Sequence, residues 1–166
     1  MARSGNASGQ IAALSDGQSF GSLTQSVRAD SLRGKRVRFT AWVKTREVGQ
    51  PGSQNGASLW MRVDGGGGSL GFDNMSTRSV RGTSDWTRHS IVLDVPDDAV
   101  GILLGMLLNS TGDAWVDDAT LEIVDTQLPT TNTMPASRDA SRSAQQREQF
   151  AALPLDFRNL DFERVR

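Results

Sequence analysis

The stretch RVRFTAWVKTREVGQPGSQNGASLWMRV, residues 36–63, decides the fold, because it holds two alternating runs separated by a polar loop. Successive side chains of a β-strand point to opposite faces, so a run with apolar residues at every second position predicts a strand with one core face. The predicted strands are residues 36–45 and 57–64. Their core faces consist of Val37, Phe39, Ala41 and Val43, and of Leu59, Met61 and Val63.

The opposite faces of these two strands each carry a tryptophan beside an arginine, which predicts a flat, half-polar binding surface. Aromatic rings stack on the C–H faces of sugars, and arginine, aspartate and asparagine side chains hydrogen-bond hydroxyl groups. The predicted ligand contacts are Trp42, Trp60, Arg38, Arg62, Asp73 and Asn74. Alternation does not say whether a face is open, so packing of a second sheet or of the C-terminal segment over both tryptophans stays an alternative.

Composition argues against several classes of function. The 166 residues include 18 basic and 19 acidic side chains, so no overall field favours nucleic acid or a membrane. The chain has no cysteine, which excludes thiol catalysis and fits a cytoplasmic protein. The first twenty residues contain no apolar core of a secretory signal. The one histidine, His89, shares a face with Ile91 and Leu93, which favours packing over catalysis. We therefore predict no enzyme.

The rest of the chain extends the β pattern. Many short alternating segments and seventeen glycines predict an all-β sandwich over residues 7–125. The loop 47–56, rich in Gly, Gln and Asn, is a place where ligand contacts are expected. Residues 100–108 are apolar on both faces, which predicts a strand buried on both faces or glycines that allow a close approach. Residues 126–143 have the composition of a polar linker, and 144–166 predict a short helix and a further strand.

Five motifs resemble those of bacterial jelly-roll modules of the galactose-binding-like superfamily, which includes carbohydrate-binding modules. They are GKRVRFTAWVKT (34–45), LWMRVD (59–64), FDNM (72–75), GTSDW (82–86) and WVDD (115–118). Related stretches occur beside helix-turn-helix regulators and peptidases. The resemblance implies a jelly-roll β-sandwich and a domain that binds carbohydrate or another small ligand.

The chain departs from this pattern at its ends. Such modules begin with an Asn-x-x-Phe-Glu strand, whereas here that motif stands at the C-terminus, as residues 159–163. The segment either folds back onto its own sandwich, exchanges with a second copy to give a homodimer, or starts a following module. A jelly roll without its first strand would leave an exposed edge, which favours fold-back or exchange.

Related modules hold a structural calcium ion, and the resemblance places its ligands at Asp118 and Glu163. Calcium takes six to eight oxygen ligands, which backbone carbonyls can complete. The alternative is that Asp117 and Asp118 only end a solvated strand and hydrogen-bond a turn.

Together these features predict a non-catalytic module that binds carbohydrate or a small polar ligand, as the sensor or accessory part of a larger bacterial protein. The alternative is a structural module that oligomerises through its C-terminal strand. We expect no contact of this domain with nucleic acid or a membrane.

Overall fold

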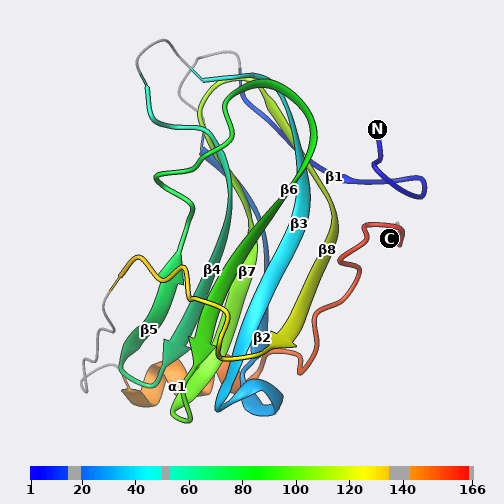
Figure 1. Ribbon diagram of the computed structural model, residues 1–166. Helices are drawn as coiled ribbons and strands as arrows, with labels where there is room; N and C mark the ends of the chain where they lie inside the picture. The colour runs from blue at the N-terminus through cyan, green and yellow to red at the C-terminus, as the bar shows by residue number, and fades with distance from the viewer. Residues whose placement is uncertain (15–19, 50–52, 135–142, 165–166) are drawn as a thin grey trace.

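The computed structural model describes residues 1–14, 20–49, 53–134 and 143–164, which form two packed layers of β-structure (Figure 1). The described residues hold eight strands, a 3₁₀ turn (Asp30–Leu32) and one α-helix, α1 (Ser143–Ala151). The strands are β1 (Gly9–Ala12), β2 (Phe20–Arg28), β3 (Lys35–Val48), β4 (Ala57–Gly65), β5 (Gly68–Asp73), β6 (Gly82–Val95), β7 (Ala99–Asn109) and β8 (Asp113–Val124).

The order of these strands defines a jelly roll. One antiparallel sheet has the order β1-β8-β3-β6, and the other has the order β2-β7-β4-β5. The chain changes sheet at each connection between consecutive strands except the β4–β5 hairpin. Two four-stranded sheets joined in this way form a double-sheet jelly roll. The predicted all-β jelly-roll sandwich with a short C-terminal helix is confirmed.

We name each of the two layers by one tryptophan on its outer face. The sheet β1-β8-β3-β6 is the Trp42 sheet, and the sheet β2-β7-β4-β5 is the Trp60 sheet. The core lies between them and is made by the inward positions of the alternating runs. Its largest fully buried side chains include Phe39, Leu59, Met61, Ile91, Leu93, Ile102, Leu104, Met106 and Leu108.

Side chains and loops cover the free edges of the sheets, which limits pairing with other chains. Thr131 bonds the backbone of Val92 on the edge strand β6, and Thr133 N–H donates to the carbonyl of Phe72 on the edge strand β5. The described part of the predicted linker thus ties the two sheets together along one side, where Figure 1 shows it in yellow passing from β8 to β5. Residues 135–142 lie outside the described residues.

The C-terminal segment 155–164 folds back onto its own chain but forms no strand, contrary to the prediction. Asn159 and Phe162 have positive φ angles of 53° and 59°, so the backbone turns where a strand would stay extended. The side chain of Gln25 on β2 bonds both the N–H and the carbonyl of Arg158 in place of a ladder. Leu160 and Phe162 line a cavity of about 150 Å³ between the sheets, together with core residues such as Phe39 and Leu104.

Candidate functional site

The structure separates the two tryptophans that the sequence placed on one surface. Trp42 lies on β3 and Trp60 on β4, and these strands belong to different sheets of the sandwich. Both rings belong to outward positions, so they face opposite sides of the molecule. The prediction of one common binding surface is therefore wrong. The long connection between β3 and β4 crosses from sheet to sheet instead of forming a hairpin, and alternation within a strand carries no information about that crossing.

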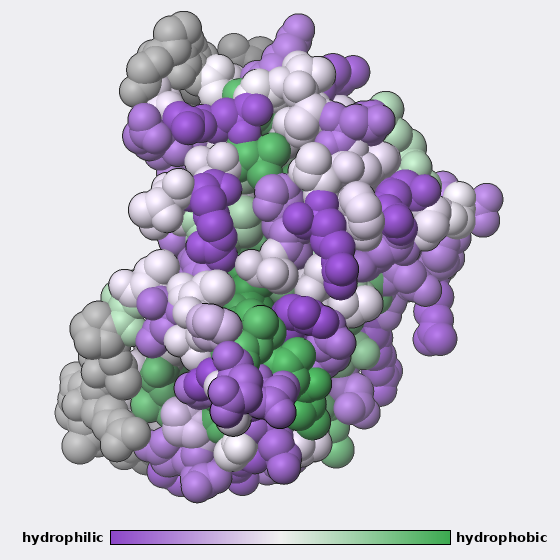
Figure 2. Space-filling model, in the orientation of Figure 1, coloured by the Kyte–Doolittle hydropathy of each residue, from purple (hydrophilic) through white to green (hydrophobic). Residues whose placement is uncertain are grey.

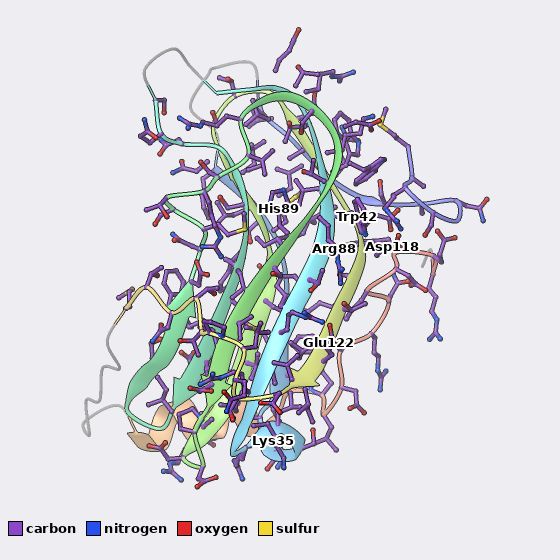
Figure 3. All side chains as sticks on the ribbon, in the orientation of Figure 1. Lys35, Trp42, Arg88, His89, Asp118 and Glu122 are labelled. Carbon is purple, nitrogen blue, oxygen red and sulfur yellow. The ribbon has the colours of Figure 1, made fainter. Side chains whose placement is uncertain are left out.

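Trp42 is covered by the N-terminal segment. The Arg3 guanidinium lies 3.9 Å from the centroid of the Trp42 ring, a cation–π contact. Arg3 also donates its backbone N–H to Asp117 and forms an ion pair with Asp118. Figure 3 shows Trp42, Arg88 and Asp118 gathered on this part of the Trp42 sheet. Arg3 thus occupies the position over the ring that a stacked ligand would need.

Ion pairs occupy much of the remaining outer face of the Trp42 sheet. Arg38 pairs with Glu122 at 2.8 Å, so this predicted ligand contact already has a partner. Further pairs join Arg36 to Asp94, Lys44 to Asp85 and Arg46 to Asp113. Figure 2 shows this face as mostly hydrophilic, with a hydrophobic patch in its lower part. Paired charges of this kind suit a solvated surface and leave few groups for a ligand.

The predicted calcium ligands do come together, in a cluster that joins the two ends of the chain. We call it the terminal clasp: Arg3, Ser4, Asn6, Ala7, Asp117, Asp118 and Glu163. Glu163 accepts the N–H groups of Asn6 at 2.7 Å and Ala7 at 3.0 Å. Asp118 accepts the Ser4 hydroxyl at 2.6 Å and has a positive φ of 47°. Figure 1 shows both chain ends beside β8.

The clasp is already satisfied by protein donors. Hydrogen bonds from Ser4, then from Arg3, hold the pKa of Asp118 below its ordinary value. The N–H groups of Ala7 and Asn6 lower the pKa of Glu163, although the nearby charge of Asp118 opposes this. The described residues hold no group of three or more acidic, histidine or cysteine side chains arranged to bind a metal. With the positive charge of Arg3 among its carboxylates, the clasp as arranged does not fit a calcium ion.

Asp73 does not face solvent, so its predicted contact with a ligand is wrong. Its side chain is 0% exposed and pairs with Arg78 at 2.6 Å, while its Oδ1 accepts the Met75 N–H at 2.8 Å. These bonds fix the chain that leaves β5. Met75 has a positive φ of 54°, rare for a residue with a large side chain, and its side chain is buried. Such strain persists where surrounding contacts hold it, and it clusters at functional sites.

The outer face of the Trp60 sheet offers unused hydrogen-bond donors. Trp60 and Arg62 lie two residues apart on β4, opposite Gly105 and Leu103 of β7. Within the described part of the chain, Trp60 Nε1 and Arg62 Nε are buried and have no hydrogen-bond partner. Buried donors are nearly always paired with protein atoms or ordered water, so these two neighbouring exceptions mark a place where water or a bound molecule would complete the hydrogen bonds. A Cβ at Gly105 would lie 1.9 Å from the Leu23 carbonyl oxygen, so the backbone of β2 approaches β7 closely at this position.

A polar cavity of about 140 Å³ lies on the same face, one step along the strands from Trp60. Ser58 and Leu107, which pair across β4 and β7, form part of its wall. We call it the amide pocket; its lining is Gln54, Asn55, Gly56, Ser58, Asn74, Ser76, Ser79, Leu107 and Asn109. Its side chains include four amides and three hydroxyls and none that ionises. Of the predicted contacts, Trp60, Arg62 and Asn74 are therefore brought to one face.

Bonds between three separate segments hold the walls of the amide pocket. Ala57 and Val80 form an isolated antiparallel bridge, and the Ser79 hydroxyl donates to the Gln54 carbonyl at 3.0 Å. Asn109 N–H donates to the Gly56 carbonyl at 3.1 Å. A Cβ at Gly56 would lie 2.6 Å from the Val80 carbonyl oxygen, so only glycine lets these segments approach. Sequence reasoning marked the loop 47–56 and Asn74 but missed the serines and Asn109, which isolated polar residues in turns do not reveal. Residues 50–52 of that loop lie outside the described residues.

Comparison with known proteins adds one relative by sequence. No family model matches the chain. The chain is 40% identical, over 131 residues, to the uncharacterized HTH-type transcriptional regulator YbfP of Bacillus subtilis (strain 168). The match covers 77% of this chain and 43% of the regulator, so the chain spans less than half the length of that relative. The resemblance to jelly-roll modules found beside bacterial transcription regulators is confirmed.

Solved structures with a similar arrangement include carbohydrate-binding modules. A family 16 carbohydrate-binding module aligns with a TM-score of 0.47 and 16% identity, over 72% of this chain and 79% of that one. A xylan-binding domain from family 22 aligns with a TM-score of 0.38 and 12% identity, over 60% of this chain and 64% of that one. The strand order described above establishes the jelly roll independently of them. Among the described residues, no helix has the length and apolar character that crossing a membrane requires.

Proposed function

We propose that this chain binds a small, uncharged carbohydrate on the outer face of the Trp60 sheet and catalyses no reaction. The observation that carries the proposal is the pair of buried, unpartnered donors, Trp60 Nε1 and Arg62 Nε, beside a pocket lined by amides and hydroxyls. A ligand rich in oxygen acceptors supplies what these donors lack.

The chemistry of the pocket matches that of a sugar. Each amide offers donors and an acceptor, and each serine hydroxyl offers both, so the lining can pair with hydroxyl groups in either direction. The half-buried Trp60 ring gives an apolar surface for C–H groups, and Leu107 supplies a second apolar contact. Ligand sites usually combine such an apolar surface with a few convergent polar groups.

The ion pairs and hydrogen bonds of the arginines around the pocket support an uncharged ligand. Arg62 pairs with Asp64 at 2.8 Å, and Arg78 pairs with Asp73. Arg81 donates to the Ser53 carbonyl and to the side-chain oxygen of Gln54. The guanidinium groups near the pocket are thus committed to protein acceptors. Two of these three positive charges are already neutralised by a carboxylate, so an acidic sugar would lose its hydration with little compensation.

Two features support binding without catalysis. His89 is half-buried, its Nε2 contacts the Thr87 hydroxyl at 2.9 Å, and burial, followed by the charge of Arg78, lowers its pKa. It lies on β6 of the other sheet (labelled in Figure 3), outside the amide pocket. The amide pocket itself holds no side chain that could act as a general acid or base.

Within a longer protein, we propose that this module acts as a cytoplasmic sensor or accessory domain that leaves nucleic-acid contact to other parts. The relationship to a regulator of which it matches 43% supports this, as do its net charge of −1 and its paired arginines. The alternative, assembly by exchange of the C-terminal segment between two copies, stays a prediction, with the segment in the irregular form described above. Light scattering over a range of concentrations tests it, because an exchanged dimer would dissociate on dilution. Deletion of residues 159–166 would convert such a dimer to a monomer.

The proposal is tested by a thermal-shift and calorimetry screen of neutral sugars against their acidic counterparts, such as methyl glucoside against methyl glucuronide. A neutral ligand present at 100 times its dissociation constant should stabilise the fold by about 2.7 kcal/mol. Asn74→Ala should weaken that binding, whereas Gln127→Ala, an exposed residue far along the chain, should not. Binding of acidic sugars alone, or of no sugar at all, would refute the proposal.

A further inference from the structure

The outer face of the Trp60 sheet has two different ends. The outward positions of β4 and β7 pair in rows across this face. The first row is Ser58 and Leu107, at the amide pocket, and the second is Trp60 and Gly105. The row of Arg62 and Leu103 follows, and the row of Asp64 and Gly101 comes last. The amide pocket therefore lies at one end of this face, at its first row. What lies over the last row decides how far a bound ligand can extend.

Helix α1 lies on that last row. A Cβ at Gly101 would be 1.9 Å from two ring carbons of Phe150, so the ring occupies the space that any larger residue would fill. Phe150 is 7% exposed. Beside it, Nε of Arg147 lies 2.5 Å from the position of a Cβ at Gly66. Asp64, which points outward from β4, is only 1% exposed, and the helix makes its contacts with β7, β4 and β2. In Figure 1, α1 is the orange helix at the lower end of the sandwich.

We infer that α1 is the length stop of the carbohydrate site: Phe150 and Arg147 end the site along β4 and β7, so that it accepts a mono- or disaccharide and rejects longer chains that run along the strands. This inference rests on the proposed function and adds the size class of the ligand to it. The rows of this face before the one under α1 run from Ser58 to Arg62, about 13 Å at the rise of a β-strand. A longer saccharide in that direction meets the Phe150 ring.

Two substitutions remove the stop by different routes. Phe150→Ala deletes the ring and leaves the Gly101 notch open. Gly101→Ala places a methyl group where the ring lies and displaces it without touching the amide pocket. Gln149→Ala, on an exposed position of the same helix, is the matched control. If one variant fails to fold, the other still tests the stop.

The experiment is isothermal calorimetry with methyl glucoside, cellobiose and cellohexaose, and with the corresponding xylose series. In the wild-type chain we expect the hexasaccharides to bind at least tenfold more weakly than the short sugars. Phe150→Ala and Gly101→Ala should each raise the ratio of hexasaccharide to monosaccharide affinity at least tenfold, and Gln149→Ala should leave that ratio unchanged. Equal affinity of the wild-type chain for short and long sugars overturns the length stop but leaves the proposed function intact. Failure of every sugar with the wild type and both variants overturns both.

Discussion

Trp42 and Trp60 share the same sequence setting, a tryptophan with an arginine at a neighbouring outward position, yet they meet different surroundings. Trp42 has Arg3 over its ring, and Arg38 beside it is paired with Glu122. Trp60 faces Gly105, and its indole donor and Arg62 Nε have no partner within the described chain. On the Trp42 sheet, the protein's own Arg3 covers the tryptophan ring. On the Trp60 sheet, unpaired donors lie next to a pocket without ionisable side chains.

The difference shows that outward alternation identifies a face but not its occupant. On the Trp42 sheet, the occupant is a segment more than thirty positions away in sequence, and its contact depends on a single arginine. On the Trp60 sheet, α1 lies at the far end, where the Phe150 ring takes the place that a side chain at Gly101 would fill. Coverage is decided by individual side chains from distant segments rather than by the strand that carries the tryptophan.

The largest expected effect is on binding at Trp60. Trp60→Ala should weaken binding of the sugar found by the screen about 30-fold, which corresponds to a hot-spot loss of about 2 kcal/mol. The loss comes from the stacking surface and the indole donor together. Calorimetry on the variant measures it.

The matched control is Trp42→Ala, which should leave the affinity within about twofold because Arg3 already covers that ring. Equal losses in both variants would mean that the two faces do not differ in the way proposed here.

A smaller effect is expected on stability at Trp42. Trp42→Ala should lower the free energy of unfolding by about 1–2 kcal/mol, because it removes a half-buried ring and the cation–π contact to Arg3. Urea denaturation measures the change. Arg3→Ala should reproduce part of the loss, and the double variant should lose less than the sum, since both substitutions break one contact. Additive losses would show that the arginine and the ring act independently.

The sequence pattern predicts some of these features and not others. The period-two pattern predicts the core faces of residues 36–45 and 57–64 correctly, because burial of one face is a local property of a strand. For residues 100–108 it left open burial on both faces or a close approach at a glycine, and the structure shows Phe150 close to Gly101. It does not assign strands to sheets, so it placed Trp42 and Trp60 together. The resemblance to jelly-roll modules brought Asp118 and Glu163 to one place, as the structure does. The amide pocket needs three segments to meet, and no local pattern encodes that meeting.

The pH dependence of stability separates the terminal clasp from the Trp60 face. The pKa values of Asp118 and Glu163 are lower than their ordinary values of 3.8 and 4.5. A carboxyl group with a lowered pKa in the folded state contributes stability above its unfolded pKa, and this is lost as pH falls through the folded pKa. We expect acid to weaken the fold through these groups, and Glu163→Gln to reduce that dependence in urea denaturation at several pH values.

Asp64 provides the opposite sign. Burial raises its pKa above 3.8 and outweighs the hydrogen bond from Arg62. The folded state then favours the protonated carboxyl, so this contribution is present below the unfolded pKa and is lost as pH rises through the folded pKa. Asp64→Asn should remove that loss and leave the acid-side loss from the clasp in place. A variant with the same pH profile as the wild type would show that Asp64 is not buried beneath α1.

The smallest expected effect is that of calcium on the terminal clasp, whose Arg3 also covers the Trp42 ring. In the clasp, Arg3 supplies the positive charge that a cation would bring to Asp118, so adding calcium or a chelator should leave the thermal midpoint of the wild type unchanged. Arg3→Gln removes that charge and leaves Asp117, Asp118 and Glu163 with only hydrogen-bond donors around them. Oxygen-rich sites with unbalanced carboxylates are those that calcium occupies. We therefore expect the variant, unlike the wild type, to gain thermal stability with millimolar calcium. A wild-type midpoint that falls on chelation would show instead that calcium displaces Arg3, and Trp42 would then lose its cover and become a second open face.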